Sequence, residues 1–198
     1  EMPQTGSKVP QRYNTEYRPL PLDSYALEVA ALGGVQPGWH HLFSLGWYML
    51  ACLAAFGFCW HVLRLAYAPL VAAALAAVGA WLFALHPLHS EVVLNLKNRD
   101  EVMALGLGFA ACWAGLLGLR AGRRMASAGW VALSAGLVLA ALLSKLTAVL
   151  HLVPFAAAVW LLGPRAHWRR LLALGLAWAA VGLGVYLLRQ AVIGETIR

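Results

Sequence analysis

Six apolar runs, each close to the length that crosses a lipid bilayer, constrain this chain more than any other feature. They are Trp39–Leu65, Tyr67–Leu85, Val102–Leu119, Ser127–Leu143, Leu146–Leu162 and Leu171–Leu188. A helix of about 20 residues spans the hydrocarbon core, and a helix satisfies its own backbone hydrogen bonds in lipid. With 62% hydrophobic and 12% charged residues, the composition is that of an integral membrane protein. We therefore predict an all-α polytopic transmembrane helical bundle of about six helices.

Residues 1–38 precede the first run and are predicted to form an external loop. This arm is polar and proline-rich, and its only apolar-periodic segment, Tyr25–Leu32, is too short to span. Asp23 or Ser24 could cap that segment, and Gly33 could end it. It is interpreted as an interfacial helix.

Residues 39–198 are predicted to form the transmembrane domain, with an external loop at 86–101. The fourth and fifth runs are separated only by Ser144-Lys145. Joined as one helix of roughly 36 residues, they would exceed the ~30 Å hydrocarbon core. A tight hairpin is therefore expected at Lys145.

The positive charges predict the orientation of the bundle. Alternate connections carry seven bases and no acid: Arg64, Arg120, Arg123, Arg124, Arg165, Arg169 and Arg170. By the positive-inside rule these connections are cytoplasmic. Of the 15 Lys and Arg, the remaining eight share the other side with all eight acids. The net charge of +7 is therefore a topology signal, and no nucleic-acid partner is needed to explain it.

This topology places the arm outside the membrane with no helix before it. The chain also starts at Glu1, without a signal peptide. At least one upstream helix is therefore expected, which would make this sequence a fragment.

The polar stretch 86–101 holds three of the eight acids and two of the seven histidines between two apolar runs. Such a cluster must lie at a membrane face or line a wet cavity. If Ser90 caps a short helix, steps of three and four residues bring one carboxylate, two amides and one guanidinium to a single face. These are the side chains of Glu91, Asn95, Asn98 and Arg99. On another side, Lys97 could pair with Glu101.

Two plainer interpretations stay open. The stretch 86–101 could be a charged connector between membrane helices, and Lys145 could extend its amine to the interface. His86 and His89, three residues apart with no third well-spaced ligand, are a weak zinc signal, and no metal ligand is assigned. A divalent cation held by Glu91 or Asp100 is an alternative cofactor.

Three segments resemble one family of membrane enzymes. Tyr17–Leu20 (YRPL) and Gly33–Leu42 (GGVQPGWHHL) resemble its first external loop. His86–Val93 (HPLHSEVV) and Lys97–Glu101 (KNRDE) resemble its second external loop, and Ser144–Thr147 (SKLT) resembles the next external turn. The family is that of the membrane O-mannosyltransferase-like proteins with tetratricopeptide repeats, which include the cadherin-targeting mannosyltransferases and bacterial relatives.

This resemblance implies a GT-C type glycosyltransferase fold and a site on the external or lumenal face of the bacterial inner membrane or endoplasmic reticulum. Such enzymes move a sugar, here mannose-like, from a polyprenyl-phosphate donor to a protein or glycan acceptor. The catalytic carboxylate of the fold usually follows the first transmembrane helix, which is expected upstream of Glu1. The chain has no tetratricopeptide repeats, and it has Lys145-Leu146 where many relatives have Lys-Glu.

The expected site combines the chemistry of these side chains with the resemblance. Arg18, Arg99 and Lys145 would bind the donor phosphate, since guanidinium and ammonium groups suit that anion. Glu91 and Asp100 are the candidate catalytic carboxylates, which would shape the acceptor or metal site. Further external-site candidates are Tyr17, His86, His89 and Asn95. The alternative function is a non-catalytic membrane subunit or a transporter-like protein.

Overall fold

The computed structural model describes residues 17–162 and 168–196, and within these ranges every regular element is a helix. Four helices are long and apolar enough to cross a membrane. They are α2 (Pro37–Leu63), α5 (Arg99–Arg120), α6 (Arg124–Ser144) and α8 (Trp168–Thr196). The shorter elements are α1 (Pro19–Leu32), α3 (Pro69–Ala84), α4 (Pro87–Leu94), η1 (Leu96–Asn98), η2 (Leu146–His151) and α7 (Leu152–Leu162).

The expectation of six full spans is met in part. Two of the predicted spans correspond to shorter apolar helices, Pro69–Ala84 and Leu146–Leu161. At 16 residues, α3 reaches about 24 Å, which is less than the ~30 Å hydrocarbon core. Proline at its start and the polar residues after Leu85 limit its length. The described part of the protein is therefore all-helical, with four helices that could span a membrane.

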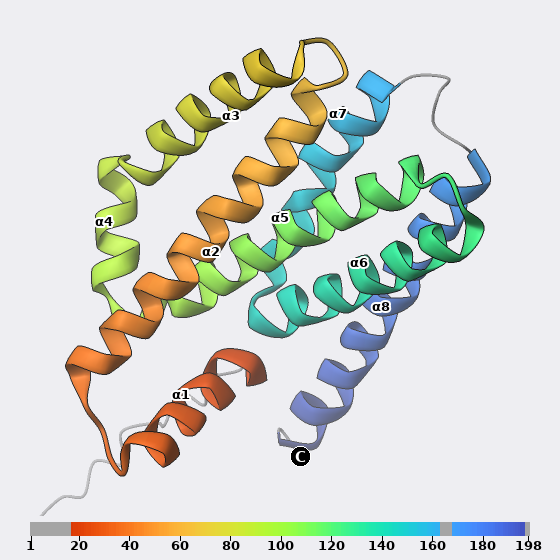
Figure 1. The fold of residues 1–198 in the computed structure, drawn as a ribbon. Helices are drawn as coiled ribbons and strands as arrows, with labels where there is room; N and C mark the ends of the chain where they lie inside the picture. Colours follow the sequence, from red (N-terminus) through yellow and green to blue (C-terminus); the bar gives the residue numbers. More distant parts are fainter. Residues whose placement is uncertain (1–16, 163–167, 197–198) are drawn as a thin grey trace, which may run out of the picture.

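Helix α5 forms the centre of the bundle and packs between α2 and α6 (Figure 1). In the most apolar stretch of α5, 67% of the residues are buried, against 17% in the corresponding stretch of α8. Glycine makes the close packing feasible, since a Cβ at Gly106 would lie 3.1 Å from Ala51 Cα of α2. A Cβ at Gly108 would lie 2.5 Å from a ring nitrogen of His151 in η2, which is closer than real contacts allow.

Buried hydroxyl groups link α6 to α5 and α8. Ser134 Oγ donates a hydrogen bond to the Ala111 carbonyl at 2.7 Å, and the Trp178 indole donates to that Oγ at 3.0 Å. Ser127 Oγ donates to the Gly118 carbonyl at 2.9 Å. Interhelical hydrogen bonds of this kind hold helices together where no hydrophobic driving force exists between them.

The connections gather at two opposite ends of the bundle (Figure 1). The α2–α3 and α5–α6 connections and the start of α8 lie at one end, here called the basic end. The opposite end, here called the paired end, holds α1, the α4–α5 connection, the α6–η2 break and the end of α8. This grouping matches the predicted alternation, although Arg165 lies outside the described residues.

Two predicted helix boundaries are confirmed and one is wrong. Helix α6 ends at Ser144, with Lys145 in an extended conformation before η2. Gly33 ends α1 with a left-handed φ of 69°. Helix α1 begins at Pro19, however, so neither Asp23 nor Ser24 caps it. Proline at the first helical position has φ preset for a helix and lacks an N–H that would need a partner.

Candidate functional site

Arg99 is the first residue of α5 and lies at the paired end. Its side chain is buried, although residues in the first turn of a helix are often exposed. The residue is only 1% exposed. Its Nε donates to Ser44 Oγ at 3.0 Å and one Nη donates to the His40 carbonyl at 2.7 Å, both on α2. The other Nη donates to the Glu28 carboxylate and, at 3.2 Å, to Ser24 Oγ on α1. Arg99 therefore ties α1, α2 and α5 together.

Glu28 and His40 complete this buried arginine network, which comprises Arg99, Glu28, His40, Ser24 and Ser44. Glu28 is 7% exposed and His40 is 3% exposed. The second Glu28 oxygen lies 2.5 Å from His40 Nδ1, so both carboxylate oxygens have partners. A buried charge of this kind is tolerated only when it is paired and hydrogen-bonded.

Tyr25 covers the outer side of the network. The Arg99 guanidinium lies 3.8 Å from the centre of the Tyr25 ring, in cation–π geometry. The Tyr25 hydroxyl donates to the Leu96 carbonyl, so α1 is also joined to η1. Burial raises the pKa of this hydroxyl, partly offset by the positive charge of Arg99.

Asp100 contacts two cations that are far from it in sequence, Arg18 and Lys145. Its Oδ2 accepts a hydrogen bond from Arg18 and lies 3.6 Å from Lys145 Nζ. Its Oδ1 accepts from the Glu101 N–H at 2.8 Å, which suits a carboxylate in the first turn of a helix. Lys145 also donates to Glu101, whose other oxygen lies 3.4 Å from Thr147 Oγ1.

Arg18, Asp100, Glu101 and Lys145 are called the ion-pair cluster below. It sums to no net charge, and its members differ in exposure. The Asp100 side chain is 6% exposed, Lys145 19%, Arg18 23% and Glu101 42%. Glu101 is the more exposed of the two carboxylates near Lys145. An incoming anion could therefore replace Glu101 more readily than Asp100, because Glu101 is already partly solvated.

A pocket of about 290 Å³ runs from the ion-pair cluster into the apolar part of the bundle. Glu101 and Thr147 line its end at the cluster, and Leu105, Phe109 and Pro154 line the rest together with the imidazole of His151. An ionic end and a mostly apolar remainder suit an amphipathic ligand.

Glu91 and Asn95 do not join Arg99, which corrects the prediction of one helical face from Glu91 to Arg99. Helix α4 ends at Leu94, and Asn95 is extended, with its side-chain oxygen accepting from the Lys97 N–H at 3.1 Å. This local side-chain bond competes with helical hydrogen bonding and breaks the helix. Glu91 is exposed on α4, and Arg99 takes Glu28 as its carboxylate instead.

The predicted Lys97–Glu101 pairing is also wrong, because Glu101 pairs with Lys145. Lys97 is exposed in η1, and the break before α5 removes the regular four-residue spacing. Arg99 departs from the prediction as well, since its guanidinium is enclosed by protein groups and does not face an open pocket.

The other predicted site residues lie outside the ion-pair cluster. His89 Nδ1 lies 2.7 Å from the Phe83 carbonyl and 3.1 Å from the Tyr48 hydroxyl, so it joins α4 to the end of α3 and to α2. The His86 ring packs 5.7 Å from the His89 ring. Tyr17 is half-buried beside Arg18. Among the described residues, no group of three His, Cys, Asp or Glu side chains could hold a metal ion.

Sequence reasoning missed Glu28, His40, Ser44 and the role of Glu101. One signal could have pointed to Glu28, which is the only acid inside the apolar-periodic segment Tyr25–Leu32. A lone carboxylate among apolar residues usually has a cationic partner. No comparable signal marks Ser44, since a serine in a membrane helix is common.

Comparison with known protein families, characterised proteins and solved structures finds no match to the chain.

Proposed function

We propose that this chain is part of a membrane glycosyltransferase that moves a sugar from a polyprenyl-phosphate donor to a hydroxyl acceptor. The observation that carries the proposal is the ion-pair cluster. Arg18 and Lys145 both contact the carboxylate of Asp100. The three residues come from segments that are far apart in sequence. These same three segments resemble the external loops of O-mannosyltransferase-like enzymes.

Arg18 and Lys145 would hold the donor phosphate. Both are partly exposed cations that Asp100 orients toward one point. On binding, the phosphate would replace Glu101 at Lys145, because Glu101 is the most exposed carboxylate of the cluster. Arg99 would act as a positioning residue, since the buried arginine network fixes the start of α5 and hence Asp100.

The chemistry requires a leaving group with stabilised negative charge. The bond from the anomeric carbon to the phosphate oxygen breaks, and the acceptor oxygen forms the new bond to that carbon while its proton passes to a general-base carboxylate of the full-length protein. The phosphate keeps the electron pair, and the Arg18 and Lys145 cations would stabilise its charge. The hydrocarbon part of the donor fits the pocket lined by Leu105, Phe109 and Pro154.

The test measures transfer of radiolabelled sugar from a panel of polyprenyl-phosphate sugars by membranes containing the full-length protein. Lys145→Gln and Arg18→Gln should each lower the transfer rate about 10²-fold, the order expected when one preorganised charge is lost. Lys97→Gln is the matched control, because Lys97 is exposed and close in sequence to the cluster; its rate should stay unchanged. Detergent unfolding of each variant distinguishes lost chemistry from lost structure.

Two results would overturn the proposal. If the wild-type protein transfers no sugar from any donor of the panel, the chain is better described as a non-catalytic subunit or a transporter-like protein. If Lys145→Gln and Lys97→Gln lower transfer equally and slightly, the ion-pair cluster is structural.

A further inference from the structure

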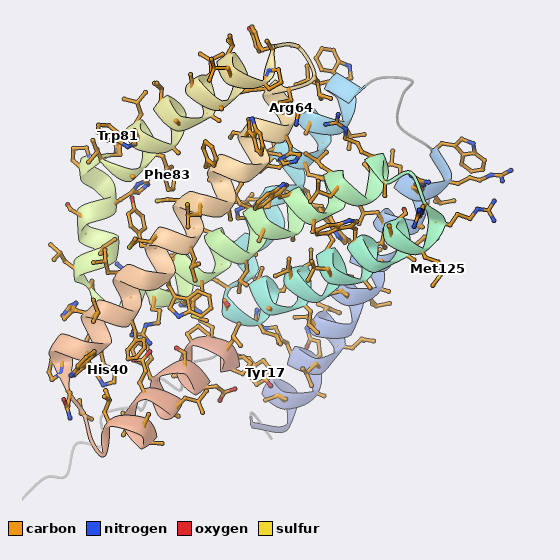
Figure 2. The ribbon with its side chains drawn as sticks, viewed as in Figure 1. Tyr17, His40, Arg64, Trp81, Phe83 and Met125 are labelled. Atoms are coloured by element: carbon orange, nitrogen blue, oxygen red, sulfur yellow. The ribbon has the colours of Figure 1, made fainter. Side chains whose placement is uncertain are left out.

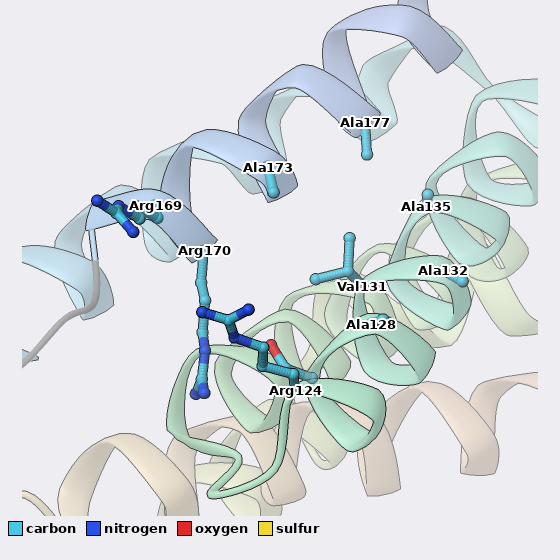
Figure 3. A pocket seen from close by; sticks show the side chains of 10 residues that line it. Arg124, Ala128, Val131, Ala132, Ala135, Arg169, Arg170, Ala173 and Ala177 are labelled. Carbon is cyan, nitrogen blue, oxygen red and sulfur yellow. The ribbon is translucent and has the colours of Figure 1, made fainter.

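A groove of about 730 Å³ lies between α6 and α8 at the basic end. Arg124, Arg169 and Arg170 line it, and Figure 3 shows the Arg124 and Arg170 side chains close together and the Arg169 side chain directed away from them. Its apolar part is lined by small side chains: Ala128, Val131, Ala132 and Ala135 from α6, and Ala173 and Ala177 from α8. We call it the arginine groove.

The arginines of the groove are not balanced by acidic side chains in the described lining. No acidic residue is among the described residues that line it, and the sequence contains no Asp or Glu at all from 102 through 194. Arg170 donates to the Leu119 carbonyl at 3.3 Å and also to the Ala121 carbonyl, so it partly fastens α8 to the end of α5. Arg124 and Arg169 are exposed, and Arg169 packs 5.4 Å from the Trp168 ring.

The length of the groove matches one membrane leaflet. Ala135 stands eleven positions after Arg124 on α6, which corresponds to about 16 Å along the helix axis. That is roughly half of the ~30 Å hydrocarbon core. Trp168, which packs against Arg169, is 66% exposed and Trp130 is 37% exposed, as expected of tryptophans at the headgroup level.

We propose that the arginine groove binds one anionic glycerophospholipid. Its phosphate binds at the end of the groove that Arg124, Arg169 and Arg170 line, and one acyl chain follows the alanines between α6 and α8. Arginine suits a phosphate diester because its guanidinium can donate two parallel hydrogen bonds. Basic pockets between membrane helices on the cytoplasmic side are typical binding sites for anionic headgroups. A soluble phosphate would use the arginines but would leave the apolar length empty.

The site is independent of the proposed sugar transfer, because it lies at the other end of the bundle (Figure 1). By the positive-inside rule it would take its lipid from the cytoplasmic leaflet. The bound lipid would fill the space between two helices whose contact is otherwise supported by the Trp178–Ser134 hydrogen bond.

The experiment is native mass spectrometry of the purified protein, released from detergent, with phosphatidylglycerol or phosphatidylcholine added. Wild-type protein should retain one phosphatidylglycerol more tightly than phosphatidylcholine. Each arginine near a lipid surface contributes about a fivefold preference. The double variant Arg124→Gln/Arg169→Gln should therefore weaken phosphatidylglycerol binding about 30-fold, with Arg170 left intact because it supports α8. Arg64→Gln, a base of the same end that lies outside the groove lining, should not change binding.

A second pair of variants tests the acyl chain without changing charge. Ala177→Leu narrows the groove and should weaken phosphatidylglycerol binding, whereas Ala180→Leu on an exposed face of α8 should not. The proposal is overturned if glycerol 3-phosphate displaces the lipid at equal concentration, because the site would then recognise a soluble anion. It is also overturned if the arginine variants leave phosphatidylglycerol binding unchanged, or if wild-type protein forms a dimer that Ala177→Leu dissolves, since the groove would then hold a helix.

Discussion

The two ends of the bundle handle positive charge in opposite ways. At the paired end Arg99 is 1% exposed, and four side-chain or carbonyl partners surround it. At the basic end Arg124 and Arg169 are exposed residues of a groove that no described acid lines. Figure 2 labels His40 at the paired end and Met125 at the basic end, and so shows where the two ends lie. The buried arginine of the paired end has its partners within the chain, whereas the exposed arginines of the basic end suit the anionic lipid proposed above.

The largest expected effect comes from Arg99→Met. Removing the guanidinium leaves the Glu28 carboxylate buried beside His40 without its cation. We expect the free energy of unfolding to fall by about 3–5 kcal/mol, as for other broken buried ion pairs. Helicity measured by circular dichroism during titration of detergent-solubilised protein with dodecyl sulfate gives this value.

Lys97→Met is the control for this loss, since Lys97 is exposed two residues away. Replacing Glu28 by Leu in the Arg99→Met background should restore part of the stability, because no unpaired charge then stays buried. Similar small losses for Arg99→Met and Lys97→Met would contradict the distinction between the two ends.

Asp100→Asn should have a smaller effect on the ion-pair cluster. The substitution keeps the shape and removes the charge that Arg18 and Lys145 share. Because both cations are partly exposed, we expect a loss of about 1–2 kcal/mol, below the ~3–5 kcal/mol of a broken buried ion pair. Asp23→Asn, on the exposed side of α1, is the control and should change the free energy of unfolding little. If both variants lower it equally, the ion-pair cluster adds no stability.

Ionisation of the partly buried Tyr25 hydroxyl should make the free energy of unfolding depend on pH, and this effect arises at the paired end. Burial raises the pKa of the Tyr25 hydroxyl above the ordinary value of 10.0, so the unfolded chain loses this proton first. The stabilising contribution is complete below pH ~10 and is lost as the pH rises through the higher pKa of the folded state. Unfolding titrations at rising alkaline pH should show this decline in wild-type protein and a weaker decline in Tyr25→Phe. Tyr67→Phe, at a 50% exposed position, should behave as wild type does; a decline unchanged in Tyr25→Phe would rule out this origin.

The smallest expected effect in detergent is that of Arg124→Gln/Arg169→Gln. Exposed side chains without acidic partners contribute within about 0.5 kcal/mol to folding. The contrast should appear in lipid, where vesicles containing phosphatidylglycerol raise the thermal unfolding midpoint of wild-type protein more than that of the variant. A large loss already in detergent would show that these arginines are paired within the protein, and the two ends would no longer differ.

Local chemistry was sufficient to predict several boundaries of the fold. The left-handed Gly33 and the break at Lys145 follow from residue type and helix length. The stretch 90–101 shows where such reasoning fails. A regular helix was predicted there, but the Asn95 side chain bonds to the Lys97 N–H and starts a new turn. One side-chain hydrogen bond thereby changed the face that each later residue occupies.

By itself, the sequence predicted that the chain is helical and apolar enough to cross a membrane, and that seven bases lie on one side while all eight acids share the other side with the remaining bases. These properties depend on composition and on spacing along one helix. The structure reduces the six expected spans to four candidates. Only the tertiary structure decided which charges meet: Glu28 pairs with Arg99 across 71 positions, and Asp100 pairs with Arg18 across 82. The physical reason is that an ion pair forms where packing brings two helices together and excludes water. That geometry depends on small contacts such as Gly106 against Ala51, which no periodic pattern encodes.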